Sequence, residues 1–138
     1  ADAGVELVCL AGFMRLLSEE FVNYWRDRLI NIHPSLLPAF KGLNVQARAI
    51  AAGAKFSGCT VHYVRQEMDE GPIICQAVVP IYQDDDTNAL TARILTQEHL
   101  IYPQAVRWIA EKRVSINNEK VELDRPIQSN HTIINPSS

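Results

Sequence analysis

The sequence is poor in cysteine, in net charge and in long apolar runs. Its three cysteines form neither a CxxC pair nor a zinc-binding spacing, which favours free thiols in a reducing compartment over disulfides. A formal charge of −3 gives no basic surface for nucleic acid or an anionic membrane. No apolar run reaches the ~18 residues that cross a bilayer, and the N-terminus lacks the basic segment of a signal peptide. We therefore expect a cytoplasmic protein that binds neither nucleic acid nor membranes.

The composition that remains is that of an ordinary globular protein. Of its 138 residues, 47 % are apolar and 21 % are charged. This length is enough for one domain with a sizeable core, so we assign residues 1–138 to a single domain. The chain starts without Met in an apolar run, from which we expect a segment of a longer protein.

The apolar and capping patterns predict an α/β fold with a mixed, mainly parallel sheet flanked by helices. Residues 5–13 are almost continuously apolar, as in a strand that is buried on both faces. Ser18 and the acidic residues after it predict a helix over 18–25. Further strands are expected at 28–33, 59–64 and 72–82, the last two antiparallel. Helices are expected at 45–53 and 87–112, the second kinked or broken by Pro103. A small hairpin around Asn117 and Asn118 and a poorly ordered tail at 124–138 complete the prediction.

The stretch NIHPSLLP, residues 31–38, places an amide and an imidazole at the end of a predicted buried strand. Side chains two positions apart in a strand face the same side, so Asn31 and His33 project together. Open α/β sheets bind ligands at the carboxyl ends of their parallel strands. An Asn amide can donate to a developing oxyanion, and an imidazole can move a proton near neutral pH. The alternative is that His33 is a satisfied structural residue.

Asp69 lies in the predicted loop 65–71 between two strands that can border the same crevice. A carboxylate beside His33 would raise the pKa of the imidazole and favour its charged form. The sequence has no GxSxG elbow for a serine nucleophile, so we expect a substrate to supply the nucleophile. His33, His62 and Asp69 are also residue types that zinc accepts, an alternative that we rank far below catalysis without metal.

Five stretches in this order resemble the folate-dependent formyltransferase family: AGFMRLL, NIHPSLLPAFKG, GCTVHYV, MDEGPIICQ and LTQEHLIYP. The resemblance runs from about residue 5 to 114. It implies a formyltransferase fold and transfer of a formyl group from N10 of 10-formyltetrahydrofolate to an amine. The resemblance also implies that the amine is that of glycinamide ribonucleotide, in de novo purine biosynthesis, and that no metal takes part.

By this resemblance, Asn31 holds the formyl oxygen, His33 polarises or handles the proton, and Asp69 orients and charges the imidazole. Glu98 and Asn31 bind the nucleotide substrate, with Glu98 on its ribose hydroxyls. The residues implied to line the folate pocket are Phe13, Met14, Arg15, Leu16, Leu17, Val64, Arg65, Gln66, Glu67 and Met68. Those implied to support the site from behind are Ser35, Thr60 and His62.

The family begins with a strand and a phosphate-binding turn at a helix N-terminus, and nothing in this sequence matches them. We therefore expect the C-terminal portion of such an enzyme, without the first part of its nucleotide-binding unit, and a bare sheet edge able to self-associate. Three alternatives stay open: a methionyl-tRNA formyltransferase, a formyltetrahydrofolate hydrolase and a folate-binding module without catalysis.

Overall fold

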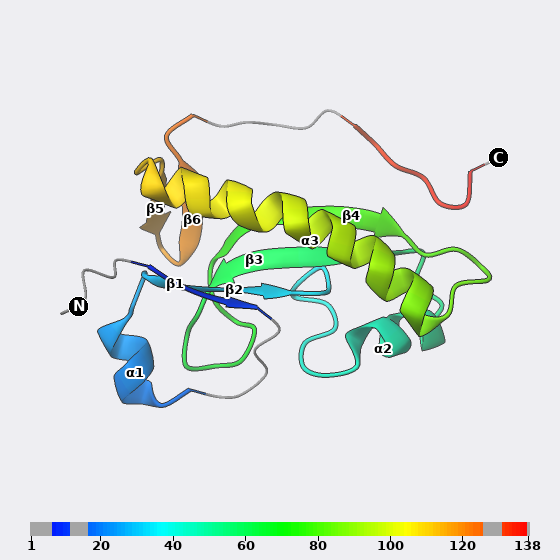
Figure 1. Ribbon diagram of the computed structural model, residues 1–138, viewed down its shortest axis with the longest axis horizontal. Helices are drawn as coiled ribbons and strands as arrows, with labels where there is room; N and C mark the ends of the chain where they lie inside the picture. Colours follow the sequence, from blue (N-terminus) through cyan, green and yellow to red (C-terminus); the bar gives the residue numbers. More distant parts are fainter. Residues whose placement is uncertain (1–6, 12–16, 126–130, 138) are drawn as a thin grey trace.

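A four-stranded mixed sheet forms the centre of the fold (Figure 1). In this computed structural model, residues 7–11, 17–125 and 131–137 are described. The strands lie in the order β1-β2-β3-β4, with bounds β1 (Val8–Ala11), β2 (Leu29–His33), β3 (Phe56–Tyr63) and β4 (Ile73–Pro80). All four coincide with predicted strands, although β3 begins three residues earlier than expected. The α/β class with a mixed sheet is confirmed.

The expected parallel majority is wrong for the described strands. Only β1 and β2 are parallel, whereas β2–β3 and β3–β4 are antiparallel. The connection between β2 and β3, which contains the short helix α2 (Val45–Ala51), is not a parallel crossover, because β3 runs antiparallel to β2. A loop too short for a crossover then joins β3 to β4, which enforces an antiparallel pair as predicted.

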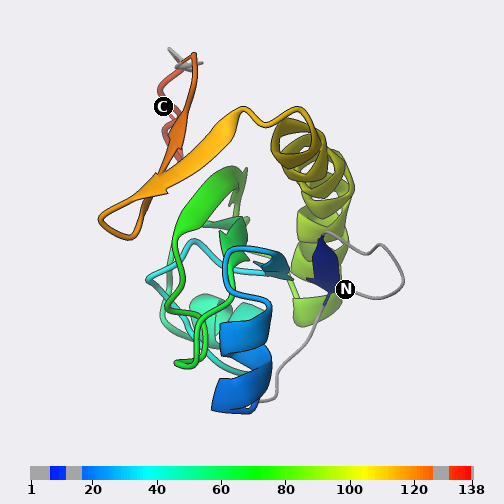
Figure 2. The same cartoon turned by 90° about the vertical axis from the view of Figure 1, so that its left-hand side faces the viewer.

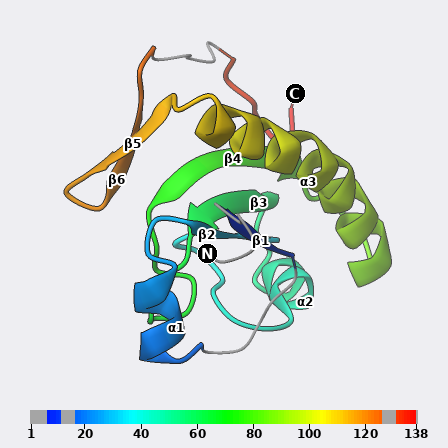
Figure 3. The ribbon, with the colours of Figure 1, turned by 60° about the vertical axis from the view of Figure 1, so that its left-hand side comes forward.

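Helices flank this sheet on both sides (Figure 3). Helix α1 (Glu19–Tyr24) starts at Ser18, whose side chain accepts a hydrogen bond from the amide of Phe21, as the capping pattern predicts. Helix α3 (Thr87–Ala110) is capped in the same way by Asp86. Figure 3 shows α3 arching over one side of the sheet, with α1 on the other side. Helix α2 contacts α3, and its buried residue Ala49 belongs to the same core cluster as Leu90 and Ile94, so α2 packs with α3 rather than across the sheet from it.

Pro103 does not break α3, which runs as one helix from Thr87 to Ala110. Buried side chains lie on both sides of the proline: Leu90 and Ile94 before it, Ala105 and Trp108 after it. They pack into the same core cluster as Ile30 and Val61 of the sheet. Packing of both halves against one surface keeps the helix continuous, although proline removes one of its hydrogen bonds.

A hairpin follows α3, formed by β5 (Val114–Asn117) and β6 (Lys120–Leu123) (Figure 2). Its turn residues Asn118 and Glu119 both have positive φ, 54° and 59°, as a two-residue type I′ turn requires. The turn thus lies one residue later than predicted. Of the predicted tail, residues 126–130 and 138 lie outside the described part, and its expected disorder stays a prediction. Within 131–137, the side-chain amide of Asn135 donates to the carbonyls of Lys55 and Ile81.

None of the helices described in the structure has the length and apolar character needed to cross a membrane.

Candidate active site

The strand register collects four polar side chains on one face of the sheet. Asn31 pairs with His62 across β2 and β3, and His33 pairs with Thr60. Residues two apart in each strand share a face, so the two pairs form adjacent rows at the carboxyl end of β2. All four are buried, with exposed fractions of 5 % or less. The structure therefore brings the two predicted catalytic residues of β2 against two of the predicted supporting residues.

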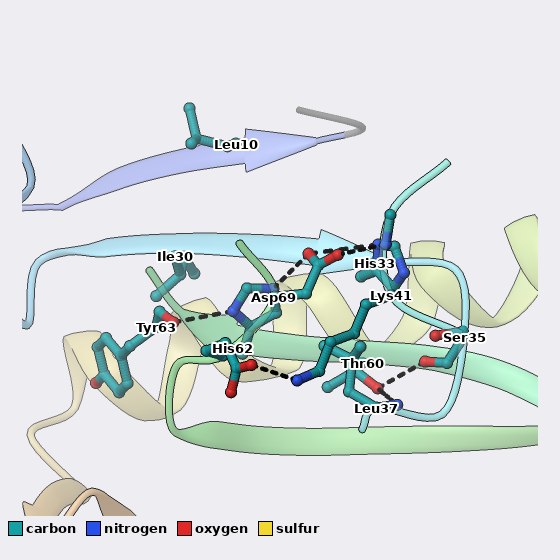
Figure 4. Close-up of polar contacts among 12 residues, drawn as sticks. Leu10, Ile30, His33, Ser35, Leu37, Lys41, Thr60, His62, Tyr63 and Asp69 are labelled. Atoms are coloured by element: carbon teal, nitrogen blue, oxygen red, sulfur yellow. Dashed lines mark hydrogen bonds and ion pairs between the residues drawn. The ribbon is translucent and has the colours of Figure 1, made fainter. Parts of the chain in front are cut away.

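The carboxylate of Asp69 lies between the rings of His33 and His62 (Figure 4). Its Oδ1 atom is 3.6 Å from Nδ1 of His33 and 3.9 Å from Nε2 of His62, and its Oδ2 accepts a hydrogen bond of 2.9 Å from the amide of Gly42. Its side chain is buried. The loop between β3 and β4 thus delivers its carboxylate to the end of β2, as the sequence predicted.

Each imidazole has its other nitrogen bound to a main-chain carbonyl. Nε2 of His33 lies 2.9 Å from the carbonyl oxygen of Phe40, and Nδ1 of His62 lies 2.9 Å from that of Tyr63. A carbonyl oxygen only accepts, so both of these nitrogens carry a proton. The two rings consequently turn Nδ1 of His33 and Nε2 of His62 toward the same oxygen of Asp69. These are the nitrogens through which a proton can be gained or lost.

Burial lowers the pKa of His62, and this effect outweighs the opposing influence of its hydrogen bond to Tyr63 and of the charge on Asp69. The His62 ring is therefore neutral at pH 7, with an unprotonated Nε2 facing the carboxylate. Of the two imidazoles beside Asp69, His62 is a packing partner, and its Nε2 makes no hydrogen bond to any residue that the structure describes. This fits the supporting role implied for it.

Thr60 holds the loop that follows β2. Its hydroxyl donates to the carbonyl of Ser35 (2.7 Å) and accepts from the amide of Leu37 (3.1 Å). The Gln76 side chain on β4 donates to the same hydroxyl and to the carbonyl of Leu37. The Ser35 hydroxyl donates to main-chain carbonyls further along, at Ala39 and Phe40. Ser35 and Thr60 thus hold the loop that follows β2. Sequence reasoning missed Gln76, which its place in an otherwise apolar strand signals.

Sequence reasoning also missed the main chain of residues 39–42. The Phe40 carbonyl fixes the His33 ring and the Gly42 amide holds Asp69, so one short segment positions both side chains. Phe40 has a φ of 53°, an uncommon conformation for an aromatic residue. Lys41 forms an ion pair with Glu70 beside Asp69. Backbone groups leave no residue-type signal, so only the fold reveals them.

The predicted folate residues fall into three groups. Residues 64–68 and Leu17 line a small cavity of about 20 Å³ together with Leu10, Asn31, His62 and Asp69. The Gln66 side chain connects the loop to Leu17 by donating a hydrogen bond to the Leu17 carbonyl (3.0 Å). The Arg65 side chain instead points to Glu119 and Asp27. Phe13, Met14, Arg15 and Leu16 lie outside the described residues.

Glu98 lies on α3 in a separate cavity of about 620 Å³. This cavity is lined by Cys9, Ala11 and Ile32, which alternate in β1 and β2 with the residues Leu10 and Asn31 of the small cavity. The two cavities therefore lie on opposite faces of the β1–β2 pair. The structure does not place Glu98 in the cluster of Asn31, His33 and Asp69. Burial raises the pKa of the Glu98 carboxyl.

The geometry of the site does not support the alternative of a zinc site at His33, His62 and Asp69. Within residues 7–11, 17–125 and 131–137, no group of three or more His, Cys, Asp or Glu side chains is arranged to hold a metal ion. What the cluster offers is an amide, an imidazole and a carboxylate at the end of a strand, beside a loop rich in main-chain hydrogen-bonding groups. Such a set suits stabilisation of an oxyanion with proton movement.

Comparison with known proteins also relates this chain to formyl transferases. The profile of the family described as "Formyl transferase" matches residues 1–106. The trifunctional purine biosynthetic protein adenosine-3 of Drosophila melanogaster is 54% identical over 117 residues, which are 85% of this chain and 9% of that protein. The crystal structure of phosphoribosylglycinamide formyltransferase from Anaplasma phagocytophilum superposes with a TM-score of 0.87 at 49% identity, covering 92% of this chain and 63% of that one.

A more distant neighbour is a formyltetrahydrofolate deformylase from Pseudomonas syringae. It has a TM-score of 0.81 and 32% identity, and the match covers 86% of this chain and 40% of the deformylase. In each of these three comparisons the chain spans less than two thirds of the protein that it matches. The motif order, the fold and the family profile agree over most of its length, and the chain belongs to the formyl transferase family.

Proposed function

We propose that this chain carries the formyl-donor site and the catalytic side chains of a phosphoribosylglycinamide formyltransferase. The reaction moves a formyl group from 10-formyltetrahydrofolate to the amine of glycinamide ribonucleotide. The observation that carries the proposal is the meeting of Asn31, His33 and Asp69 at the end of β2, since two separate segments, β2 and the loop after β3, supply the amide, imidazole and carboxylate there.

The folate binds along the loop 64–69 in this proposal. Residues 64–68 line the small cavity beside Asn31 and Asp69, and their main-chain groups can read the donor and acceptor edge of a pterin ring. The formyl group at N10 then reaches the carboxyl end of β2. Leu17, tied to Gln66 by a hydrogen bond, contributes to the same pocket.

The nucleotide binds on the opposite face of the β1–β2 pair. Glu98 in the larger cavity accepts hydrogen bonds from the ribose hydroxyls, and Ile32 lines the floor of this cavity. Ile32 stands between Asn31 and His33 in β2, so two substrates on the two faces of the strand can meet at its end. This arrangement brings the amine to the formyl carbon without a covalent enzyme intermediate.

The amine lone pair attacks the formyl carbon and forms a new C–N bond, while the carbonyl electrons move to oxygen. Asn31 donates its amide N–H to this oxyanion, and His33 stabilises it from the same face of β2. Collapse of the intermediate breaks the bond between the formyl carbon and N10. The nitrogen of the amine loses a proton and N10 gains one, and Asp69 with His33 provides the route for this transfer.

A chimera tests the proposal. In it, this chain replaces the matching segment of the Anaplasma phagocytophilum enzyme, where the two are 49% identical. We expect formyl transfer from 10-formyltetrahydrofolate to glycinamide ribonucleotide. Asn31→Ala and Asp69→Asn should each lower kcat by on the order of 10²-fold, as loss of an oxyanion donor does. Glu122→Gln, an exposed hairpin residue, is the control.

The products of the same assay separate the alternatives. Formate released without formylated nucleotide would identify a hydrolase, and tetrahydrofolate binding by the parent chain without turnover in the chimera would identify a binding module. If Asn31→Ala and Asp69→Asn both left kcat within about threefold of the parent, the assigned roles would be wrong.

A further inference from the structure

The side chain of Arg65 leaves the candidate folate pocket and joins two distant turns. Its Nε and Nη2 atoms donate to the two carboxylate oxygens of Glu119, over 2.9 Å and 3.1 Å. Nη2 also donates to Oδ1 of Asp27 over 2.8 Å. The side chain of Arg65 is only 7 % exposed, whereas those of Asp27 and Glu119 are about half exposed. One buried cation is thus held by two carboxylates that approach it from the surface.

Both carboxylates sit on well-defined turns. Asp27, with a φ of 62°, lies in the connection from α1 to β2, and Glu119, with a φ of 59°, lies in the turn between β5 and β6. Arg26 adds a further hydrogen bond to Glu119 over 3.2 Å. The guanidinium therefore ties the loop after β3 to the corner before β2 and to the tip of the hairpin.

The tethered loop is the one on which the proposed function depends. Arg65 stands between Val64 and Gln66 in the lining of the small cavity, and Asp69 follows in the same loop. The amide of Val64 donates to the carbonyl of Leu29, which fixes the start of the loop. Arg65 is the next point of attachment. Its side chain acts on the loop backbone rather than on a substrate.

We propose that Arg65, held by Glu119 and Asp27, is a positioning residue that sets the folate-binding conformation of the loop 64–69. The inference rests on the proposed function, and it gives the β5–β6 hairpin a role in donor binding although the hairpin contributes no residue to the lining of the cavity. A planar guanidinium suits this task because it can serve both oxygens of Glu119 and one of Asp27 together, which a lysine ammonium cannot match in geometry.

The variant Glu119→Gln tests the proposal. Because the Glu119 side chain is about half exposed, we expect the variant chain to fold. In the chimera, we expect it to raise the KM for 10-formyltetrahydrofolate about tenfold and to leave kcat within about threefold, the size of one lost charge-assisted hydrogen bond. Arg65→Lys should raise the KM by a similar factor. Glu122→Gln removes the same charge from the same hairpin and should leave both constants unchanged.

Amide hydrogen exchange on the chain itself provides a readout that does not require catalysis. Residues 64–69 should exchange faster in Glu119→Gln than in the parent or in Glu122→Gln, with no folate present. Unchanged exchange together with an unchanged KM would refute the positioning role of Arg65. Faster exchange of this loop in Glu119→Gln would support the tether even if the parent chimera neither bound tetrahydrofolate nor turned over. The inactive parent chimera would then refute the proposed function alone.

Discussion

The ring of His33 donates its Nε2 proton to the main-chain carbonyl of Phe40, over 2.9 Å. This single contact determines which nitrogen is left for chemistry, because only Nδ1 then faces the carboxylate of Asp69. A second imidazole, His62, approaches the same carboxylate with the opposite edge, since its Nδ1 donates to Tyr63. The two rings of the site are thus fixed in opposite orientations by the backbone.

Nuclear magnetic resonance can check these orientations. We expect the neutral ring of His33 to carry its proton on Nε2 and the neutral ring of His62 to carry its proton on Nδ1. Long-range ¹⁵N–¹H correlation spectra distinguish the two tautomers, and a His62→Gln variant assigns the signals. Identical neutral tautomers for both rings would contradict the hydrogen bonds described above.

Acid should destabilise the fold through His62. Burial lowers the pKa of this ring below its ordinary value of 6.5, so the unfolded chain binds more protons than the folded chain once the pH falls through about 6.5. Stability contributed by the neutral ring is therefore present above that pH and is lost on acidification. We expect thermal unfolding scans to show a smaller loss of Tm between pH 7 and pH 5 in His62→Gln than in the parent. Parallel pH profiles for the two proteins would be evidence against this.

Gly71 should tolerate no side chain, because a Cβ atom there would lie 1.6 Å from the carbonyl oxygen of Tyr63. Gly71→Ala must displace the end of the loop that carries Asp69, and we expect a loss of roughly 2–4 kcal/mol in the free energy of unfolding. Gly53→Ala is the control: it has open space but a φ of 72°, which costs about 1 kcal/mol. Urea titrations measure both. Equal losses would mean that the close approach to Tyr63 does not constrain the loop.

The three cysteines should differ in reactivity. Burial raises the pKa of all three thiols, that of Cys59 to about 12 and that of Cys75 to about 11, but of the three only Cys9, on β1, is exposed. Because the thiolate is the nucleophile, we expect a thiol reagent at pH 8 to label Cys9 first and the other two only after unfolding. Mass spectrometry of the labelled peptides, with a urea-treated sample as control, gives the order. Early labelling of Cys59 would show that this part of the core opens.

Local signals in the sequence were sufficient for most elements. Apolar runs marked the strands, and Ser18 and Asp86 marked the starts of two helices through contacts within one turn. The predicted break at Pro103 does not occur, because the local cost of the proline is smaller than the stabilisation from packing α3 on the sheet. The direction of β3 relative to β2 was not predictable from local sequence, since it depends on the path of the connection through α2 rather than on the residues of either strand.

The chemistry of the site divides in a similar way. Residue types and their order along the chain determined which groups are available: an amide and an imidazole two positions apart, a carboxylate in a later loop, and the likeness to formyltransferases that the family profile confirmed. Only the tertiary structure decided how they meet, because main-chain atoms of residues 40 and 42 aim His33 and Asp69, and a distant hairpin holds Arg65. Backbone groups are the same at every residue, and their positions are set by the whole fold.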